Sequence, residues 1–185
     1  MSRSVADTVE FGRRLGRGVR LDVAGPSIRV VSLVGDLGAG KTHLAKGLVA
    51  GLGGEADEVT SPTFTLLAVY ETPTGEVHHL DCYRLSGPEE AADVGFEASL
   101  GDDPPTGTRR VVLIEWASRL PGLLPPETNR LEVTLAPGGP VGGPPASDVS
   151  AEGPAAWAST DSAINGRVLT VTGLRPQEAT ALSAD

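Results

Sequence analysis

The residues with the clearest chemical meaning are eight consecutive ones that read G-D-L-G-A-G-K-T. They fit the phosphate-binding pattern G-x-x-x-x-G-K-[ST]. In such a loop the glycines let backbone N–H groups point at a phosphate, and the helix that follows adds the partial positive charge of its N-terminus. Lysine can then reach the β- and γ-phosphates, and the final hydroxyl can take a coordination position on Mg²⁺. We therefore predict a nucleotide-binding loop made of Gly35, Asp36, Leu37, Gly38, Ala39, Gly40, Lys41, Thr42 and His43.

The segments around this loop agree with a phosphate-binding role. Upstream, residues 28–34 form a short β-branched run that is typical of a buried parallel strand. Downstream, Leu44, Leu48 and Leu52 recur at four-residue spacing, which predicts an amphipathic helix. A plain glycine-rich turn is the alternative in a chain with 24 glycines. Lysine, however, occurs only at positions 41 and 46, so the complete pattern in this context rarely arises by chance.

A phosphate loop needs an acid that holds or orients the metal, usually at the end of a neighbouring strand. Glu115 follows four apolar residues, and we predict that it serves Mg²⁺ together with Thr42. An acid at a strand edge that faces water is the alternative for Glu115. Asp81 ends a second β-type run, and its carboxylate could orient the attacking water or bind the metal through water. Lys41, Asp81 and Glu115 are therefore the candidate catalytic residues.

Several residues near these acids have more than one interpretation. His78 and His79 lie beside Asp81, which suggests a zinc site, although histidines that pack or pair on a strand are the commoner outcome. Arg84 could contact a phosphate or pair with a carboxylate. Trp116, directly after the predicted metal-binding acid, could pack in the core or form a wall of the site.

The segment 60–65, T-S-P-T-F-T, is a hydroxyl-rich turn between the predicted helix and the next strand. Such a segment can close on a γ-phosphate and relax after hydrolysis, as switch loops do. An ordinary capped turn is the alternative. On the first interpretation, Ser61 and Thr63 are the switch residues.

The remaining pattern predicts one α/β domain. A first helix runs to about Arg17, strands at 66–70 and 77–81 form a hairpin after the phosphate-loop helix, and a short helix opens at Pro88. Residues 130–135 and 167–172 alternate as strands do. We expect a core at 1–136, a flexible Gly/Pro/Ala-rich loop at 137–160, and a terminal strand of the same domain with a C-terminal tail at 161–185.

Composition narrows the range of partners. The net charge of −9 opposes unaided binding to RNA or DNA, because a protein that grips nucleic acid normally shows a basic face. One cysteine excludes an internal disulfide. The sequence lacks the apolar run of a signal peptide or a membrane span, so we expect a cytoplasmic protein with no membrane partner.

Taken together, these motifs resemble the TsaE family, also called YjeE, of bacterial P-loop ATPases for tRNA threonylcarbamoyladenosine synthesis. Order and spacing agree from about residue 7 to 135. The combination is far more specific than the phosphate loop alone. The matching stretches are 35–42 (G-D-L-G-A-G-K-T), 59–66 (V-T-S-P-T-F-T-L), 79–85 (H-L-D-C-Y-R-L), 88–90 (P-E-E), 113–116 (L-I-E-W) and 123–125 (L-L-P).

The resemblance implies a P-loop NTPase-like fold, a mostly parallel central sheet flanked by helices, with ATP and Mg²⁺ at the strand ends. It implies that Lys41 and the surrounding amides bind phosphates, that Thr42 and Glu115 serve Mg²⁺, and that Asp81 is needed for hydrolysis. It also implies TsaD-like and TsaB-like partners, whose complex transfers a threonylcarbamoyl group to adenosine 37 of tRNA. The protein would then contact tRNA only indirectly, through those partners.

Two other functions share part of the pattern. A small-molecule kinase would have the same strand, loop and acid, but it would need an acceptor pocket and usually an arginine-bearing lid. A nucleotide-dependent docking subunit would hydrolyse ATP only incidentally. A GTPase that reads guanine through N-K-x-D is excluded, because the lysines at 41 and 46 do not form that segment.

Overall fold

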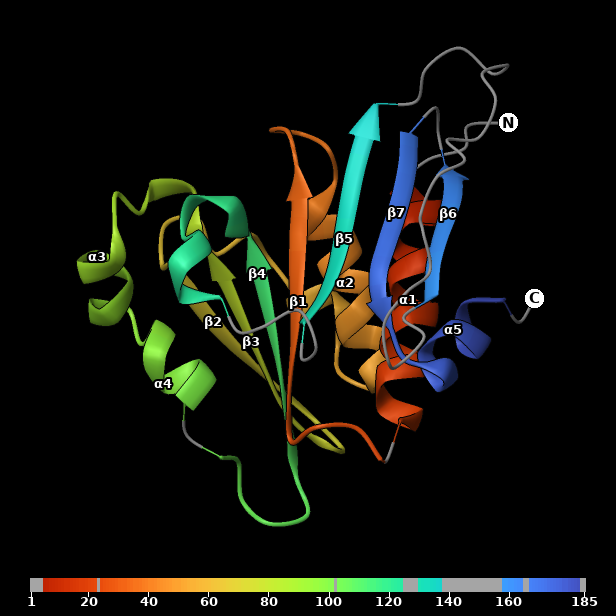
Figure 1. The fold of residues 1–185 in the computed structure, drawn as a ribbon, viewed down its shortest axis with the longest axis horizontal. Coiled ribbons are helices and arrows are strands. Elements are labelled where there is room, and N and C mark those ends of the chain that lie inside the picture. The colour runs from red at the N-terminus through yellow and green to blue at the C-terminus, as the bar shows by residue number, and fades with distance from the viewer. Residues whose placement is uncertain are drawn as a thin grey trace, which may run out of the picture.

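A seven-stranded sheet separates two layers of helices (Figure 1). The computed structural model describes residues 5–22, 24–101, 103–124, 130–137, 158–164 and 167–183. The strand order is β2-β3-β4-β1-β5-β7-β6. The strands are β1 (Ile28–Gly35), β2 (Leu67–Thr72), β3 (Gly75–Asp81), β4 (Arg109–Glu115), β5 (Arg130–Pro137), β6 (Ala158–Ile164) and β7 (Arg167–Leu174).

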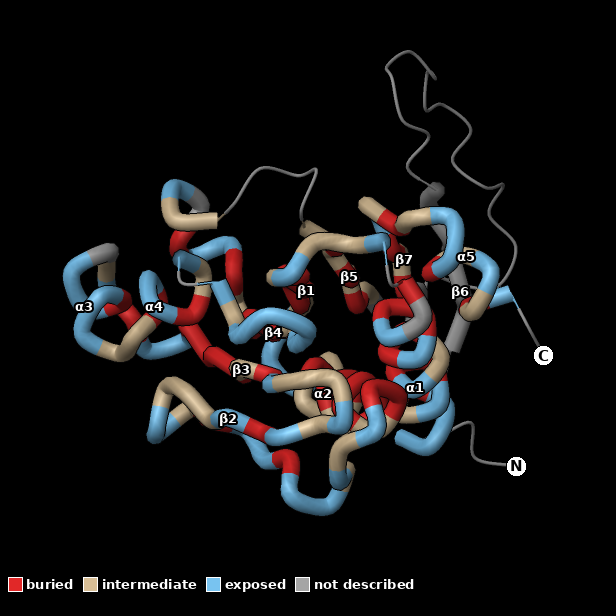
Figure 2. The backbone as a smooth tube through the Cα atoms, turned by 90° about the horizontal axis from the view of Figure 1, so that it is seen from below, coloured by how far each residue is buried: buried red, intermediate tan, exposed pale blue. Residues whose placement is uncertain are grey.

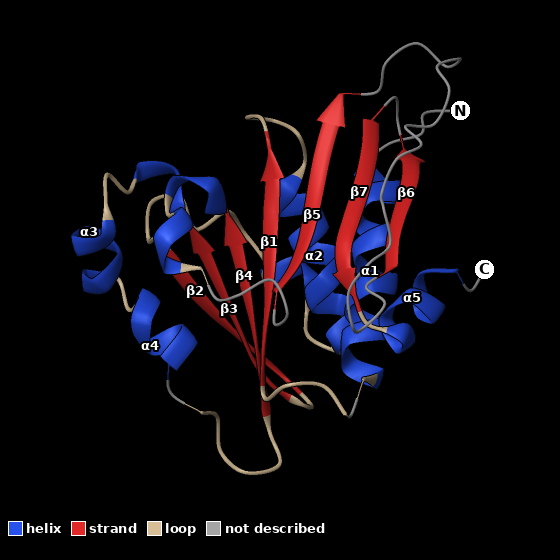
Figure 3. Cartoon of the chain, in the orientation of Figure 1, coloured by secondary structure: helices blue, strands red, loops and turns tan. Residues whose placement is uncertain are grey.

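The four central strands are parallel and both edges are antiparallel. β4 and β5 pair in parallel with β1, and β3 pairs in parallel with β4. β2 forms the predicted hairpin with β3, while β7 pairs antiparallel with both β5 and β6. The carboxyl ends of β1, β3 and β4 therefore lie at the same end of the sheet, the upper end in Figure 3. This arrangement confirms the predicted mostly parallel sheet, and it brings the predicted site residues to one place.

The two faces of the sheet carry separate cores. On one face, α1 (Val5–Leu21), α2 (Lys41–Leu52) and α5 (Pro176–Ser183) cover side chains such as Val31, Leu33 and Leu113. On the other face, α3 (Pro88–Asp93), α4 (Phe96–Gly101) and short 3₁₀ segments cover side chains such as Val30 and Ile114. Figure 2 shows this burial along the central strands and on the facing sides of α1 and α2. β1 and β4 are buried on both faces, and successive residues join opposite cores because successive side chains of a strand point to opposite faces.

Glycine allows α1 and α2 to lie against each other at backbone distance. A Cβ atom at Gly47 of α2 would fall 1.9 Å from the carbonyl oxygen of Val9 in α1. No side chain fits at that separation. The phosphate-loop helix is therefore held by direct backbone contact with the first helix.

The structure differs from the sequence expectations at three points. The first helix continues to Leu21 instead of ending near Arg17. Strand β6 was not predicted, because A-S-T-D-S-A-I has no alternating apolar pattern; it is defined by its pairing with β7. The predicted loop at 137–160 begins within β5 and ends within β6, and its residues 138–157 lie outside the described ranges. In the described part of the chain, no helix has the length and apolar character that a membrane crossing requires.

Candidate nucleotide-binding site

The phosphate loop joins the end of β1 to the start of α2. Gly40 caps α2 in the left-handed region at φ 101°, a conformation that costs glycine little. The loop is closed by a hydrogen bond from Ala39 N to Asp36 O (3.1 Å), and Leu44 N donates to Gly40 O (3.0 Å). The first backbone N–H groups of α2 thus open onto the loop. This is the geometry of an anion site.

Lys41 lies inside this loop with its side chain almost fully buried. Its Nζ donates to the carbonyl oxygens of Gly35 (2.8 Å) and Asp36 (2.9 Å), and it lies 4.0 Å from the centre of the Trp116 ring. Burial lowers the pKa of Lys41 below its ordinary value of 10.5, and the nearby carboxylates of Glu115, Asp81 and Asp36 oppose that shift. The ammonium is therefore held in position by its own loop and stabilised by surrounding negative charge.

Glu115 and Asp81 are brought together by the register of β3 and β4. The two residues lie directly opposite each other in the parallel pair, at the end of both strands. Both are nearly fully buried. Glu115 Oε1 accepts a hydrogen bond from Thr42 Oγ1 (2.9 Å), which links β4 to the first turn of α2. The expected proximity of Glu115 to the phosphate loop is what the structure has, and the alternative of a water-facing edge position is wrong.

Asp81 is tied to the 60–65 turn. Its Oδ2 accepts hydrogen bonds from the hydroxyls of Thr63 and Ser61, and its Oδ1 accepts from Tyr83 N at 2.9 Å. The two hydroxyls also contact each other at 2.8 Å. Leu66, directly after the turn, has a positive φ of 65° that is uncommon for a non-glycine residue. The predicted switch residues thus lie against the predicted catalytic aspartate.

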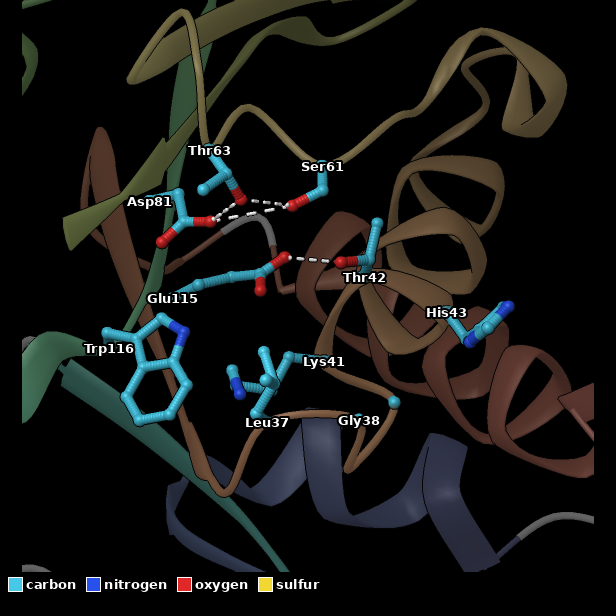
Figure 4. A pocket seen from close by; sticks show the side chains of 11 residues that line it. Leu37, Gly38, Lys41, Thr42, His43, Ser61, Thr63, Asp81, Glu115 and Trp116 are labelled. Atoms are coloured by element: carbon cyan, nitrogen blue, oxygen red, sulfur yellow. Dashed lines mark hydrogen bonds between the residues drawn. The ribbon is translucent and has the colours of Figure 1, made fainter. Parts of the chain in front are cut away.

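The phosphate loop, the two acids and the 60–65 turn line one cavity with a volume of about 200 Å³ (Figure 4). That volume is below the range of roughly 300–1,000 Å³ for whole-ligand pockets, so it suits the phosphate end of a nucleotide. Predicted residues Gly35, Asp36 and Ala39 are not in the lining. Trp116, for which the sequence allowed either core packing or a place in the wall of the site, forms part of the wall. The lining consists of Leu37, Gly38, Gly40, Lys41, Thr42, His43, Ser61, Thr63, Asp81, Glu115 and Trp116.

The two histidines of β3 point to opposite faces of the sheet. His78 Nδ1 contacts Ser99 Oγ at 2.9 Å, and its Nε2 lies 3.2 Å from Glu76. His79 lies on the side of the site, with Nε2 3.0 Å from Glu115 Oε1. Their opposite orientation prevents a joint metal site, and the described residues contain no group of three or more His, Cys, Asp or Glu side chains placed to hold a metal ion. Each histidine of the strand instead has polar partners of its own, which agrees with the commoner of the two interpretations.

In the described part of the chain, the contact of the Arg84 guanidinium is with an aromatic ring and not with a carboxylate. Its guanidinium carbon lies 5.5 Å from the ring centre of Phe64, a side chain that is 85% exposed. The contact joins the 60–65 turn to the segment that follows β3.

Comparison with known proteins identifies the family. The family model described as threonylcarbamoyl adenosine biosynthesis protein TsaE matches residues 2–139. The tRNA threonylcarbamoyladenosine biosynthesis protein TsaE of Treponema pallidum is 39% identical over 135 residues, which cover 73% of this chain and 90% of that protein. The protein of the same name from Haemophilus influenzae is 35% identical over 117 residues, or 63% of this chain and 69% of that protein.

A solved structure supports the fold independently. The crystal structure of Bacillus subtilis YdiB aligns with a TM-score of 0.54 at 23% identity, covering 96% of this chain and 86% of that chain. The family match spans well over half of the 185 residues and includes the phosphate loop, both acids and the 60–65 turn. The chain therefore belongs to the TsaE family of threonylcarbamoyladenosine biosynthesis proteins.

Proposed function

We propose that this protein binds ATP with Mg²⁺ and hydrolyses it, and that hydrolysis supports a TsaD–TsaB complex in the threonylcarbamoylation of adenosine 37 of tRNA. The observation that carries the proposal is the hydrogen bond between Thr42 Oγ1 and Glu115 Oε1 (2.9 Å), at the mouth of the phosphate loop. A hydroxyl and a carboxylate at that position are the pair that P-loop NTPases use for the metal of the nucleotide.

The donor atoms at this position suit magnesium. Thr42 and Glu115 offer oxygen ligands only, and Mg²⁺ is a hard cation that prefers oxygen. Glu115 is buried beside Lys41, so its charge is little screened by solvent. Thr42 and Glu115 would hold the ion, directly or through water. When bound, Mg²⁺ neutralises charge on the β- and γ-phosphate oxygens.

The protein's own residues account for phosphate binding. The backbone N–H groups at the start of α2 and the Lys41 ammonium converge on the cavity. Because Lys41 Nζ donates to two carbonyls of the loop, its position is set before it contacts a phosphate oxygen. Such preorganised positive charge stabilises the charge that develops during transfer of the γ-phosphoryl group.

Asp81 is the group we assign to the attacking water. Its Oδ2 lies at the cavity, where it accepts from Ser61 and Thr63. A water that donates to this carboxylate would be oriented for attack on the γ-phosphorus, with cleavage of the bond to the bridging oxygen and release of ADP and phosphate. The Ser61 and Thr63 hydroxyls would exchange Asp81 for the γ-phosphate as the turn closes. In this scheme the 60–65 turn is the switch.

The pathway role rests on the family and on charge. A net charge of −9 makes unaided contact with tRNA unfavourable, so we assign tRNA binding to the partners. ATP hydrolysis would reset the complex between turnovers and would not perform the transfer itself.

The test is reconstitution with TsaD-like and TsaB-like proteins and tRNA. We expect Lys41→Ala to lose nucleotide binding, and Asp81→Ala to keep binding but to hydrolyse ATP at least about 100-fold more slowly. Both variants should fail to sustain repeated modification. Lys46→Ala, at the other lysine of α2, and Asp93→Ala, at an exposed acid of α3, are the controls.

The same assay separates the rival functions. Full turnover by both site variants would overturn the hydrolysis-driven role and leave a docking subunit. Transfer of the γ-phosphate to a metabolite instead of water would identify a kinase.

A further inference from the structure

His79 is a fully buried side chain to which the proposed reaction assigns no role. Its Nε2 lies 3.0 Å from Glu115 Oε1, and its Nδ1 has no hydrogen-bond partner among the described residues. An imidazole with one partner places its proton toward that partner when the partner is a carboxylate. The arrangement therefore assigns the Nε2–H tautomer, which donates to Glu115.

The hydrogen bond acts on one oxygen of the carboxylate. Glu115 Oε1 accepts hydrogen bonds from both Thr42 Oγ1 and His79 Nε2. Its Oε2 accepts no hydrogen bond from the residues that the structure describes. Two donors on a single oxygen fix the rotation of the carboxylate plane. Glu115 also lines the cavity, so the second oxygen is available to a ligand there.

The position of His79 is set by the sheet and not by the phosphate loop. His79 lies opposite Leu113 in the β3–β4 register, two residues before Asp81, which faces Glu115. His79 and Glu115 are thus diagonal neighbours on one face, within reach of long side chains. The ring of Tyr70 from β2 lies 6.3 Å away, tilted by 44°. The imidazole is fully buried and contacts side chains of the two neighbouring strands, not the phosphate loop.

We propose that His79 is a positioning residue: its Nε2–H holds the Glu115 carboxylate in the orientation in which Glu115 serves the Mg²⁺ of the bound nucleotide. The inference rests on the proposed function. Donors behind a metal-binding carboxylate orient it and reduce the freedom that it loses on binding, and their removal typically costs about 10–100-fold in metal affinity or activity.

The experiment measures nucleotide binding without turnover. The affinity for a non-hydrolysable ATP analogue is determined by calorimetry with Mg²⁺ and with a chelator, and the ratio of the two affinities is compared between variants. We expect His79→Leu to lower this ratio about tenfold or more, while affinity in chelator stays within about twofold of the wild type. His79→Gln, whose amide nitrogen can donate near the position of Nε2, should restore the ratio.

The controls distinguish positioning from folding. His78→Gln changes the neighbouring histidine on the opposite face and should leave the ratio unchanged. If His79→Leu does not fold, the comparison of His79→Gln with the shorter His79→Asn decides the question, because only Gln reaches Glu115.

Each outcome bears on a separate claim. An unchanged ratio in folded His79→Leu, or in both amide variants, would overturn the positioning role. So would an equal loss of affinity with and without Mg²⁺. Failure of the wild type to bind the analogue would instead contradict the proposed function.

Discussion

Lys41 shows how a charged side chain is kept in a buried site. Desolvation lowers its pKa, while Glu115, Asp81 and Asp36 act in the opposite direction. The two carbonyl oxygens of the loop accept hydrogen bonds from two of its three N–H groups. A buried ammonium without these partners would be strongly destabilising, so the same residues that build the nucleotide site also make its lysine tolerable.

Cys82 allows a prediction that depends on burial at a single residue. It is the one cysteine of the chain, and burial raises the pKa of its thiol from 9.0 to about 12. We expect iodoacetamide to leave Cys82 unmodified in the native protein at pH values near 8, and to label it rapidly once the chain is unfolded by urea. Rapid labelling of the native protein, monitored by mass spectrometry, would contradict the burial.

The same shift sets a pH dependence. Because the folded-state pKa lies above the unfolded value, the stability that Cys82 contributes is complete below pH 9.0 and is lost as pH rises toward about 12. In Cys82→Ala the decline of unfolding free energy over that window should be less steep. Equal slopes for both proteins in urea titrations would show that the thiol does not titrate as stated.

At the scale of elements, the contact between α1 and α2 decides how firmly the phosphate-loop helix is held. A Cβ at Gly47 would lie 1.9 Å from Val9 O, so Gly47→Ala must push the two helices apart. We expect a loss of about 1–3 kcal/mol or more in unfolding free energy, despite the better helix propensity of alanine. Gly101→Ala, at a helical glycine with open space around it, is the control and should be close to neutral. Equal effects of the two substitutions in urea denaturation would contradict this packing.

A second prediction concerns the attachment of α5. Glu178 accepts from Arg29 Nε (3.0 Å) and Arg29 Nη2 (2.8 Å), and both side chains are nearly fully buried. Glu178→Gln leaves the guanidinium without its counter-charge, so we expect a loss of about 3–5 kcal/mol in urea denaturation. Glu10→Gln removes the exposed pairs with Arg13 and Arg14 (both 3.6 Å) and should cost below about 1 kcal/mol. A loss of similar size in both variants would show that burial of the α5 pair is not decisive.

The sequence predicted the parts whose signals are local. The β-branched run before the phosphate loop, the leucines of α2 and the apolar run before Glu115 each became the expected element. Glu115 and Asp81 could each be proposed as site residues because each ends a β-type run, and the carboxyl ends of parallel strands lie at the same end of a sheet.

The features that the sequence did not predict depend on contacts between residues far apart in the chain. Arg29 and Glu178 are 149 residues apart, and no local pattern links them. Strand β6 exists through its hydrogen bonds to β7. The role inferred for His79 follows from register: period-two alternation alone places it on the face of Asp81, but its contact with Glu115 required the alignment of β3 with β4.

For the whole molecule, the net charge of −9 makes a prediction about tRNA. The protein alone should give no shift of tRNA in an electrophoretic mobility assay at physiological salt. The reason is that the protein has no excess of basic charge with which to displace the counterions of tRNA. Association should appear when TsaD-like and TsaB-like proteins are added. Micromolar, salt-dependent binding of tRNA by the isolated protein would contradict the assignment of tRNA to the partners.

The central claim is that the loop at 35–42, Thr42 and Glu115 together hold ATP with magnesium. Calorimetric titration of ATP into the intact protein, with and without Mg²⁺, tests it most directly, with Lys41→Ala as the matched variant. We predict saturable binding that Mg²⁺ strengthens and that the variant loses. Absence of ATP binding by the folded wild type when Mg²⁺ is supplied would contradict the account.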